Sequence, residues 1–135
     1  MTDRQTRGQR NLNPLNIRKG DKWQGLAAEQ TDKEFCVFES PTFGFRAACK
    51  ILQKYASRGI VTIESIISRW APPSENDTKA YIAAVCKTMK ARPGDKVWPH
   101  DRTATCRLLY AMSRVESGEW PLDSIVRGYD LAQYS

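Results

Sequence analysis

The stretch RVESG at positions 114–118 places a carboxylate, Glu116, where a helix is expected to end. Apolar periodicity puts Val115 on the buried face, and Gly118 is the expected stop, so Glu116 falls in the last helical turn. The negative end of the helix dipole and partial burial would both raise the pKa of this carboxyl group. A raised pKa is what a general acid for glycoside cleavage requires. The alternative is an exposed glutamate near a fraying helix end.

A second group of residues could bind sugars. The stretch RNLNPLNIR at positions 10–18 is followed by Trp23 and Gly25. Asparagine side chains and backbone amides in a tight turn suit ligands rich in hydroxyl and amide groups, and tryptophan stacks on sugar faces. Asn13, Asn16 and Trp23 are therefore candidate substrate-binding residues. The alternative is a structural turn with Trp23 in the core.

A third stretch, WAPPSENDTKAY at positions 70–81, holds two further carboxylates, Glu75 and Asp77. Its Ser, Asn, Asp and Thr side chains are those that a helix N-terminus favours, and Glu75 would complement the helix dipole. A rigidly capped turn is also a good place to hold a catalytic carboxylate, so both interpretations stay open. Trp70 and Tyr81, at the two ends of the stretch, are candidate substrate-binding residues.

The remaining chemistry-bearing residues form no recognisable site. His100 is the only histidine, and no nucleophile motif accompanies it, which argues against a catalytic triad. The four cysteines lack the CxxC spacing typical of zinc sites, which argues against a structural zinc. Without a secretion signal, they are expected to be reduced. No phosphate-binding glycine loop or basic helix-turn-helix is found. No metal and no cofactor is predicted.

The elements that must position these residues belong to one small domain. The chain has 135 residues, of which 41% are hydrophobic and 27% charged, and its mean hydropathy is −0.56. These values are typical of a soluble globular protein. The longest apolar run, at 80–86, is far shorter than the ~20 residues of a membrane span, and the polar N-terminus indicates no signal peptide. We expect no association with a membrane.

Apolar residues at three- and four-residue spacing, together with capping side chains, predict five helices. Alternation over residues 35–38 allows a small β element. Residues 1–12 are predicted to form a basic flexible arm, and residues 13–135 a single globular domain. The expected helices run from Pro41 to about Ser57, from Thr62 to Trp70, from about Thr78 to Lys90, from Asp101 or Thr103 to Gly118, and from Pro121 or Asp123 through Leu131.

The charge is basic and unevenly spread. The net charge is +6 and the isoelectric point about 9.3. Residues 1–22 and residues 87–107 each hold six Lys or Arg against two acidic residues. A basic surface favours polyanions, either nucleic acid or an anionic cell wall, and the sequence does not distinguish the two.

Three stretches resemble a group of small proteins of tailed bacteriophages and prophages, described as virion or structural proteins. The similarity covers about residues 8–129, and WAPPSENDT is its most specific part. Typical members have glycine where this chain has Leu15, and HENG where it has VESG. The three stretches are RNLNPLNIR with WQG, FCVFESPTFGFRAACKIL, and IISRWAPPSENDTKAYI.

A weaker resemblance points to the lysozyme superfamily. The stretch AMSRVESGEWPLDS resembles the helix end of lytic transglycosylases, in which the glutamate is the catalytic acid. The Asn-rich turn with Trp-x-Gly, the Phe-x-Ser helix start, and Asp77-Thr78 with Tyr81 resemble landmarks of bacterial glucosaminidases. In those enzymes the glutamate precedes the Asn-rich turn, whereas Glu116 follows it here. A circular permutation would reconcile the two orders, and it requires the ends of the chain to lie close together.

The resemblances imply a mostly α, lysozyme-like domain of about five helices in a virion-associated phage protein that engages peptidoglycan. Glu116 would be the general acid of a glycosidase or transglycosylase, with Glu75 or Asp77 orienting water or stabilising positive charge. The expected partners are glycan strands and other virion proteins. The alternative is a non-catalytic structural or ejection protein that binds DNA or a virion partner through its basic arm. The expected location is the virion, or the host cytoplasm before lysis.

Overall fold

Helices account for the regular structure of residues 4–74 and 76–134, which are the residues described by this computed structural model. Five of the six helices in this part of the chain match those predicted from the sequence, and the short first one does not. The fold class is therefore mostly α, as expected. The helices are α1 (Arg7–Arg10), α2 (Pro41–Ser57), α3 (Ile63–Trp70), α4 (Thr78–Met89), α5 (Arg102–Glu116) and α6 (Leu122–Tyr134).

Capping side chains set most of the helix starts. Thr62 forms a capping box before α3. Asp77 and Asp101 each accept a hydrogen bond from the N–H group three residues ahead, before α4 and α5. Ser40 occupies the N-cap position of α2 but makes no capping hydrogen bond, so Pro41 at the first helical position is the start signal there.

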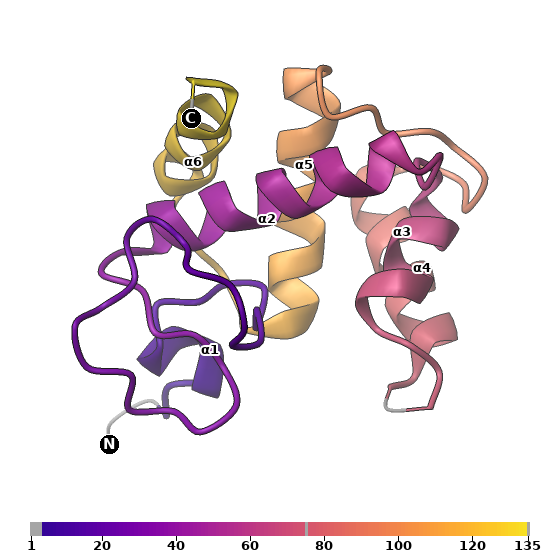
Figure 1. The fold of residues 1–135 in the computed structure, drawn as a ribbon. Coiled ribbons are helices and arrows are strands. Elements are labelled where there is room, and N and C mark those ends of the chain that lie inside the picture. The colour runs from indigo at the N-terminus through magenta and orange to yellow at the C-terminus, as the bar shows by residue number, and fades with distance from the viewer. Residues whose placement is uncertain (1–3, 75, 135) are drawn as a thin grey trace.

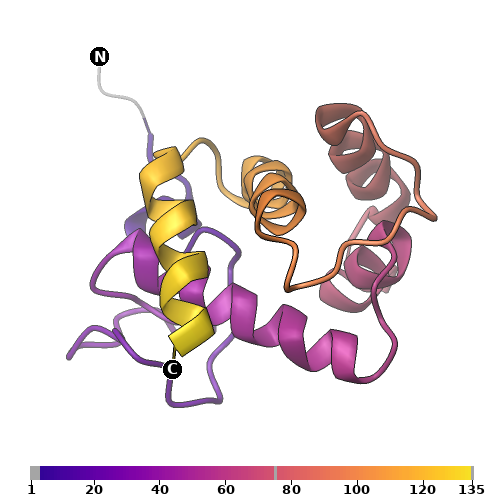
Figure 2. The same ribbon diagram turned by 90° about the horizontal axis from the view of Figure 1, so that it is seen from above.

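Helix α2 crosses the molecule and joins two lobes (Figure 1). We call residues 4–40 together with α6 the N-terminal lobe, and α3, α4 and the described residues between them the helical lobe. Helix α5 lies between the lobes and packs against both α4 and α6, as the view from above also shows (Figure 2). One hydrophobic core runs through both lobes, with Phe45, Leu108 and Met112 fully buried. None of the described helices is long and apolar enough to span a membrane.

Close packing of α6 on α2 depends on Gly128. A Cβ atom added at this position would lie 2.6 Å from Cβ of Phe45 and 2.7 Å from the carbonyl oxygen of Thr42. The absence of a side chain therefore lets the two helix backbones approach each other. This crossing holds α6 against α2.

The small β element expected at residues 35–38 is not formed as a strand. Residues 11–40 form an irregular loop structure in which Arg18 pairs with Phe35, and Leu26 with Phe38, through isolated bridges. The backbone N–H groups of Cys36 and Phe38 bond to two separate segments, at Ile17 and Asn11. Cys36 and Phe38 are buried and Phe35 and Val37 are half-buried, so burial follows the alternation, but no continuous partner strand lies alongside among the described residues.

The predicted flexible arm packs on the domain from residue 6 onward; residues 1–3 lie outside the described part of the chain. Thr6 caps α1, and Gly8 is buried. The guanidinium group of Arg7 donates two hydrogen bonds of 2.7 Å to the carboxylate of Asp32. A glycine contact, a helix cap and an ion pair hold this segment. None of these requires an apolar face, so the segment packs without apolar periodicity.

The described ends of the chain lie at opposite ends of α6. The hydroxyl group of Thr6 donates a hydrogen bond of 2.7 Å to the carbonyl oxygen of Ser117, just before α6 begins. Tyr134 ends this 13-residue helix, about 20 Å farther along its axis. The structure therefore contradicts the proximity of the chain ends that the predicted circular permutation requires.

Candidate active site

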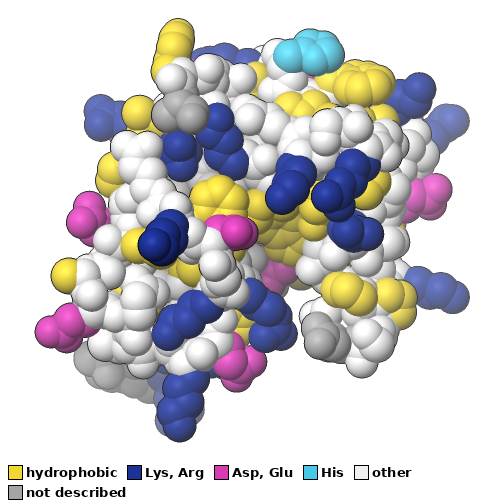
Figure 3. Space-filling model, viewed as in Figure 1, with side chains coloured by type: hydrophobic (Ala, Val, Ile, Leu, Met, Phe, Trp, Pro, Cys, Tyr) yellow, Lys and Arg dark blue, Asp and Glu magenta, His cyan; other side chains and the backbone are white. Residues whose placement is uncertain are grey.

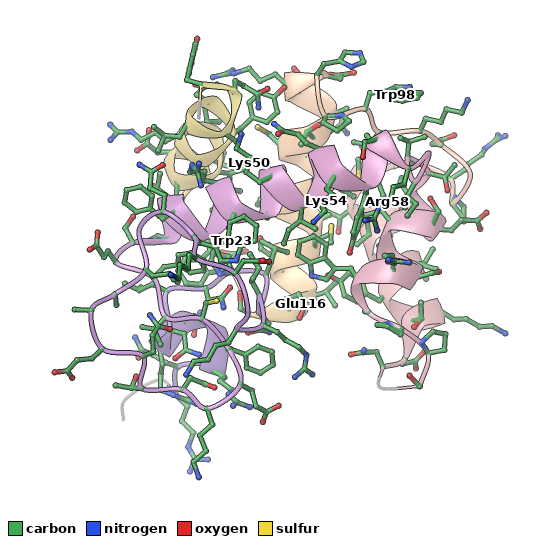
Figure 4. The ribbon with its side chains drawn as sticks, viewed as in Figure 1. Trp23, Lys50, Lys54, Arg58, Trp98 and Glu116 are labelled. Atoms are coloured by element: carbon green, nitrogen blue, oxygen red, sulfur yellow. The ribbon has the colours of Figure 1, made fainter. Side chains whose placement is uncertain are left out.

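A cleft of about 380 Å³ opens between the N-terminal lobe and the helical lobe, beneath α2. Figure 3 shows the hollow on the face of the molecule seen in Figure 1. Glu116, at the end of α5, lies between the two lobes (Figure 4). The lining comprises Leu15, Asn16, Ile17, Arg18, Asp21, Trp23 and Phe35 from the N-terminal lobe, Ile51 and Tyr55 from α2, Trp70, Ala71 and Asn76 from the helical lobe, and Glu116.

A second hollow, of about 320 Å³, adjoins Glu116 on the side of the helical lobe. It is lined by Asp77 and Tyr81, among other residues, and also by Val115. Val115 is 42% exposed, so the prediction that it faces the core is wrong. Asn76 and Glu116 line both hollows, and Glu116 is the one carboxylate that they share among the described residues. Together the hollows form a groove that passes Glu116.

Two side chains from different lobes hold the carboxylate of Glu116. Nδ2 of Asn16 lies 3.1 Å from Oε1 of Glu116, and the hydroxyl group of Tyr81 donates a hydrogen bond of 3.0 Å to Oε2. Nδ2 of Asn16 also lies 3.1 Å from the backbone carbonyl oxygen of Glu116. Both atoms that Asn16 contacts are hydrogen-bond acceptors, so the NH₂ group of its amide, and not its oxygen, faces Glu116.

Burial raises the pKa of Glu116 above its ordinary value, while the hydrogen bonds from Asn16 and Tyr81 act in the opposite direction. The direction agrees with the prediction, but desolvation rather than the helix dipole is the dominant cause. Burial and the nearby charge of Glu116 raise the pKa of Tyr81 well above its ordinary value. The Tyr81 hydroxyl therefore keeps its proton and remains a hydrogen-bond donor. A carboxyl group with a raised pKa beside an open groove can transfer a proton to a bound ligand.

The residue after Glu116 anchors the end of α5. The hydroxyl group of Ser117 donates a hydrogen bond of 2.7 Å to the carbonyl oxygen of Pro14 and accepts one of 2.8 Å from Nε1 of Trp120. Gly8 lies against it so closely that an added Cβ atom would be 2.6 Å from Cβ of Ser117. These contacts fix the backbone from which the Glu116 side chain extends.

Both predicted tryptophans line the cleft. Nε1 of Trp70 donates a hydrogen bond of 3.3 Å to the carbonyl oxygen of Leu15, and the ring meets that of Tyr55 edge to face at 6.0 Å. Trp70 therefore links the two lobes at the cleft wall. Nε1 of Trp23 is buried and has no hydrogen-bond partner among the described residues.

Asn13 does not take the substrate-binding role predicted for it. The residue is fully buried. Its Nδ2 donates hydrogen bonds to the carbonyl oxygens of Ile17 and Cys36, and its Oδ1 accepts one from the backbone N–H group of Ile17. Three of the four hydrogen bonds that its side chain can make hold the loop of the N-terminal lobe together. Asn13 is therefore a structural residue of the turn, and the cleft is served by Asn16.

The two other predicted carboxylates are Asp77 and Glu75. Asp77 caps α4 through a hydrogen bond of 3.1 Å from the backbone N–H group of Ala80, and it lines the second hollow as well. Asp77 thus both caps α4 and lines the hollow. Glu75 lies outside the residues that the structure describes.

Several cleft residues were not among the candidates derived from the sequence, and Tyr55 and Asp21 are two of them. Tyr55 follows Ile51 at the spacing of a buried helical face, yet both line the cleft. Asp21 stands in a loop without periodicity, and no pattern in the sequence marks it. It lines the cleft from the N-terminal lobe, whereas Asp77 lines the second hollow.

No group of three or more His, Cys, Asp or Glu residues that could hold a metal ion occurs within residues 4–74 and 76–134. The four cysteines are free thiols. The site thus rests on carboxylates, amides and aromatic rings.

The fold and site define a small, mostly α protein with a two-lobed cleft and a half-buried glutamate at its centre. No family model matches the chain. Protein P5 of Pseudoalteromonas phage PM2 is 38% identical to it over an alignment that covers 95% of this chain and 82% of that protein. The chain therefore belongs to the family of this bacteriophage protein, which confirms the resemblance to phage proteins.

Proposed function

We propose that this protein is a virion-associated phage protein with a lysozyme-like fold that engages peptidoglycan and cleaves its glycan strands. The observation that carries the proposal is the position of Glu116, half-buried between two hollows of one groove and held by Asn16 and Tyr81. Its raised pKa favours the protonated form that a general acid needs.

In the proposed reaction, the carboxyl group of Glu116 donates its proton to the glycosidic oxygen as the bond from the anomeric carbon to that oxygen breaks. The leaving sugar departs as an alcohol, and the anomeric carbon develops positive charge. In a hydrolase, Asp77, Glu75 or Asp21 would orient the attacking water or stabilise this charge. In a lytic transglycosylase, a hydroxyl group of the same sugar would attack instead, with Glu116 as the acid and then the base.

The cleft walls suit a glycan. Trp23, Tyr55 and Trp70 provide aromatic surface on which the apolar faces of sugar rings can pack. The relationship to a bacteriophage protein supports a role in a particle or in its infection cycle.

The alternative function, binding of DNA or a virion partner through the basic arm, receives less support. Arg7 is ion-paired with Asp32 and lies over the ring of Phe35, and Arg10 donates to the carbonyl oxygen of Gln5. Arg7, which the alternative requires as a phosphate contact, is thus already engaged within the domain.

The decisive experiment is digestion of purified peptidoglycan by the full chain, with the products identified by mass spectrometry. We expect release of muropeptides, and we expect Glu116→Gln to lower the rate by about 10²–10⁴-fold, the usual contribution of a positioned acid. Glu119→Gln is the matched control, since Glu119 is exposed and lines neither hollow. Equal activity of the two variants, or no release by the natural chain, would exclude the proposed function. Detection of the protein in purified particles tests its virion location.

A further inference from the structure

Three cations form a row along α2 at the edge of the cleft. Lys50 and Lys54 belong to α2, and Arg58 is the C-cap residue directly after it. The three follow one another at intervals of four residues, which places them along one side of the helix, about 6 Å apart along the axis. Their side chains lie on the same face of the molecule as the cleft (Figure 4). Ile51 and Tyr55, which line the cleft, lie on the adjoining helix face. We call these three residues the basic ridge.

The basic ridge is not explained by interactions within the domain. Among the residues that the structure describes, none of its side chains has an ion-pair or hydrogen-bond partner, whereas Arg7, Arg102 and Arg114 all have acidic partners. Like charges four residues apart destabilise a helix. A row of three unpaired cations therefore costs stability that a bound anion would recover.

A fourth cation continues the ridge onto the helical lobe. Arg69, in the last turn of α3, is exposed and close enough to Tyr55 for its charge to influence the pKa of that residue. Space-filling representation shows Lys and Arg side chains gathered along the upper edge of the hollow (Figure 3). Positive charge thus follows the rim of the cleft from α2 onto the helical lobe.

The charges of the lining differ from those of the rim. The lining carries Asp21, Glu116 and Arg18, and the guanidinium group of Arg18 is ion-paired with Glu34, while the basic ridge lies on the adjoining surface of α2. A nucleic acid in the cleft would bring a phosphate past these carboxylates at every nucleotide, at a cost in repulsion. A polymer with an uncharged backbone and anionic branches has the charge distribution that matches.

We propose that the basic ridge binds the carboxylate groups of acidic peptide branches attached to the glycan strand that lies in the cleft. This inference rests on the proposed function and specifies its substrate as glycan that still carries its peptides. The uncharged sugars pass Glu116, and the peptides leave the cleft over α2. Exposed charges of this kind contribute modestly to affinity and more to the rate of association.

The test measures binding of the full chain to intact cell-wall sacculi and to sacculi whose carboxyl groups have been converted to neutral amides. All proteins carry Glu116→Gln so that the wall is not degraded during the assay. The ridge variant combines Lys50→Gln, Lys54→Gln and Arg58→Gln. The control variant combines Lys87→Gln, Arg92→Gln and Lys96→Gln, which removes the same charge from exposed residues that line neither hollow.

At low salt, we expect the ridge variant to bind intact sacculi roughly 3- to 30-fold more weakly, since each exposed charge contact contributes a few-fold. Amidation should weaken binding of the unsubstituted ridge by a similar factor and leave the ridge variant unaffected. The control variant should behave like the unsubstituted ridge on both materials. Raising the salt concentration should reduce all these differences.

Two results would overturn the inference. One is an equal loss of binding in the ridge and control variants, which would indicate a general charge effect. The other is loss of binding to a DNA fragment in the ridge variant with sacculus binding unchanged, which would assign the ridge to nucleic acid. Because binding is measured without turnover, a chain that shows ridge-dependent binding yet digests no peptidoglycan would contradict the proposed glycosidase activity alone.

Discussion

The hydroxyl group of Tyr81 lies 3.0 Å from Oε2 of Glu116 and joins α4 of the helical lobe to the end of α5. Asn16 of the N-terminal lobe contacts the other carboxylate oxygen. One ionisable group is thus held from both sides of the cleft, and its proton affinity depends on how the lobes meet. Burial raises the pKa of Glu116, and the two hydrogen bonds limit the rise.

Substitution Tyr81→Phe should move the pH dependence of activity. The Tyr81 hydroxyl stabilises the charged carboxylate, so its removal raises the pKa of Glu116 further. A reaction that needs the protonated acid then persists to higher pH, and the alkaline limb of the pH–rate profile shifts upward. We also expect a loss of about 0.5–1.5 kcal/mol in the free energy of unfolding. Tyr110→Phe, outside the cleft, is the control, and a shift of the alkaline limb to lower pH would contradict the assignment.

Substitution Glu116→Gln should stabilise the fold while it removes most of the activity. Because the pKa of Glu116 is higher in the folded than in the unfolded chain, its contribution to stability is full below the unfolded pKa and is lost as pH rises through the folded pKa. The neutral amide avoids that loss, and the Tyr81 hydroxyl can rotate to accept from it. We expect a higher Tm for the variant at pH 7, by roughly 3–6 °C per kcal/mol gained, and no difference near pH 3. Thermal scans at both pH values are the measurement; a variant less stable at pH 7 would show that the carboxylate is not destabilised by burial.

Substitution Gly8→Ala should reduce both stability and activity. The added methyl group would lie 2.6 Å from Cβ of Ser117 and 2.9 Å from the carbonyl oxygen of Asn13, so backbone has to move. Overpacking of this kind costs about 1–3 kcal/mol, and here it displaces the residue beside Glu116. Gly94→Ala, with open space around the new methyl group, should be nearly neutral. Urea denaturation of both variants provides the comparison, and equal stability would mean that the N-terminal segment does not pack as described.

The ion pair between Arg7 and Asp32 should appear in the acid stability of the protein. Hydrogen bonding to Arg7 holds the pKa of Asp32 well below its usual range, against the effect of desolvation. The stability that this pair contributes is present above the unfolded pKa of Asp32 and is lost as pH falls through the lower, folded pKa. The difference in Tm between the natural chain and Asp32→Asn should therefore be largest near neutral pH and shrink below pH 4. A constant difference down to pH 2 would assign the effect to the neutral hydrogen bonds alone.

The sequence predicted the helices well because their signals are local. Thr62, Asp77 and Asp101 act within one helical turn, and the apolar spacing of each long helix depends only on neighbours in the chain. Glu116 was identified for the same reason, since RVESG marks a carboxylate at a helix end. Its environment, however, depends on Asn16 and on Tyr81, which lie 100 and 35 residues away in the sequence.

The errors arose where distant segments meet. Asn13 and Asn16 look alike in the sequence, but a backbone turn buries the first and, with Asn16 at φ 51°, directs the second to Glu116. The packing of the N-terminal segment depends on Gly8 fitting against Ser117 across more than a hundred residues, a contact without any periodic signal. Asp21 was missed for the same reason.

The identity of the second carboxylate should separate a hydrolase from a transglycosylase. Asp77→Asn removes the charge yet keeps the cap of α4, since asparagine is an equally good N-cap residue, whereas Asp77→Ala should cost about 0.5–2 kcal/mol of stability. Asp21→Asn removes the charge on the opposite lobe without disturbing a helix. If a hydrolase uses either residue, the matching asparagine variant should lose about 10²–10⁴-fold in rate, with stability unchanged and a new reducing end in every product. If neither variant loses more than a few-fold and the products carry an intramolecular anhydro ring, Glu116 acts as both acid and base in a transglycosylase. Loss of activity in Asp77→Ala but not in Asp77→Asn would show that Asp77 serves only to cap α4, since the variant that keeps the cap also keeps the rate.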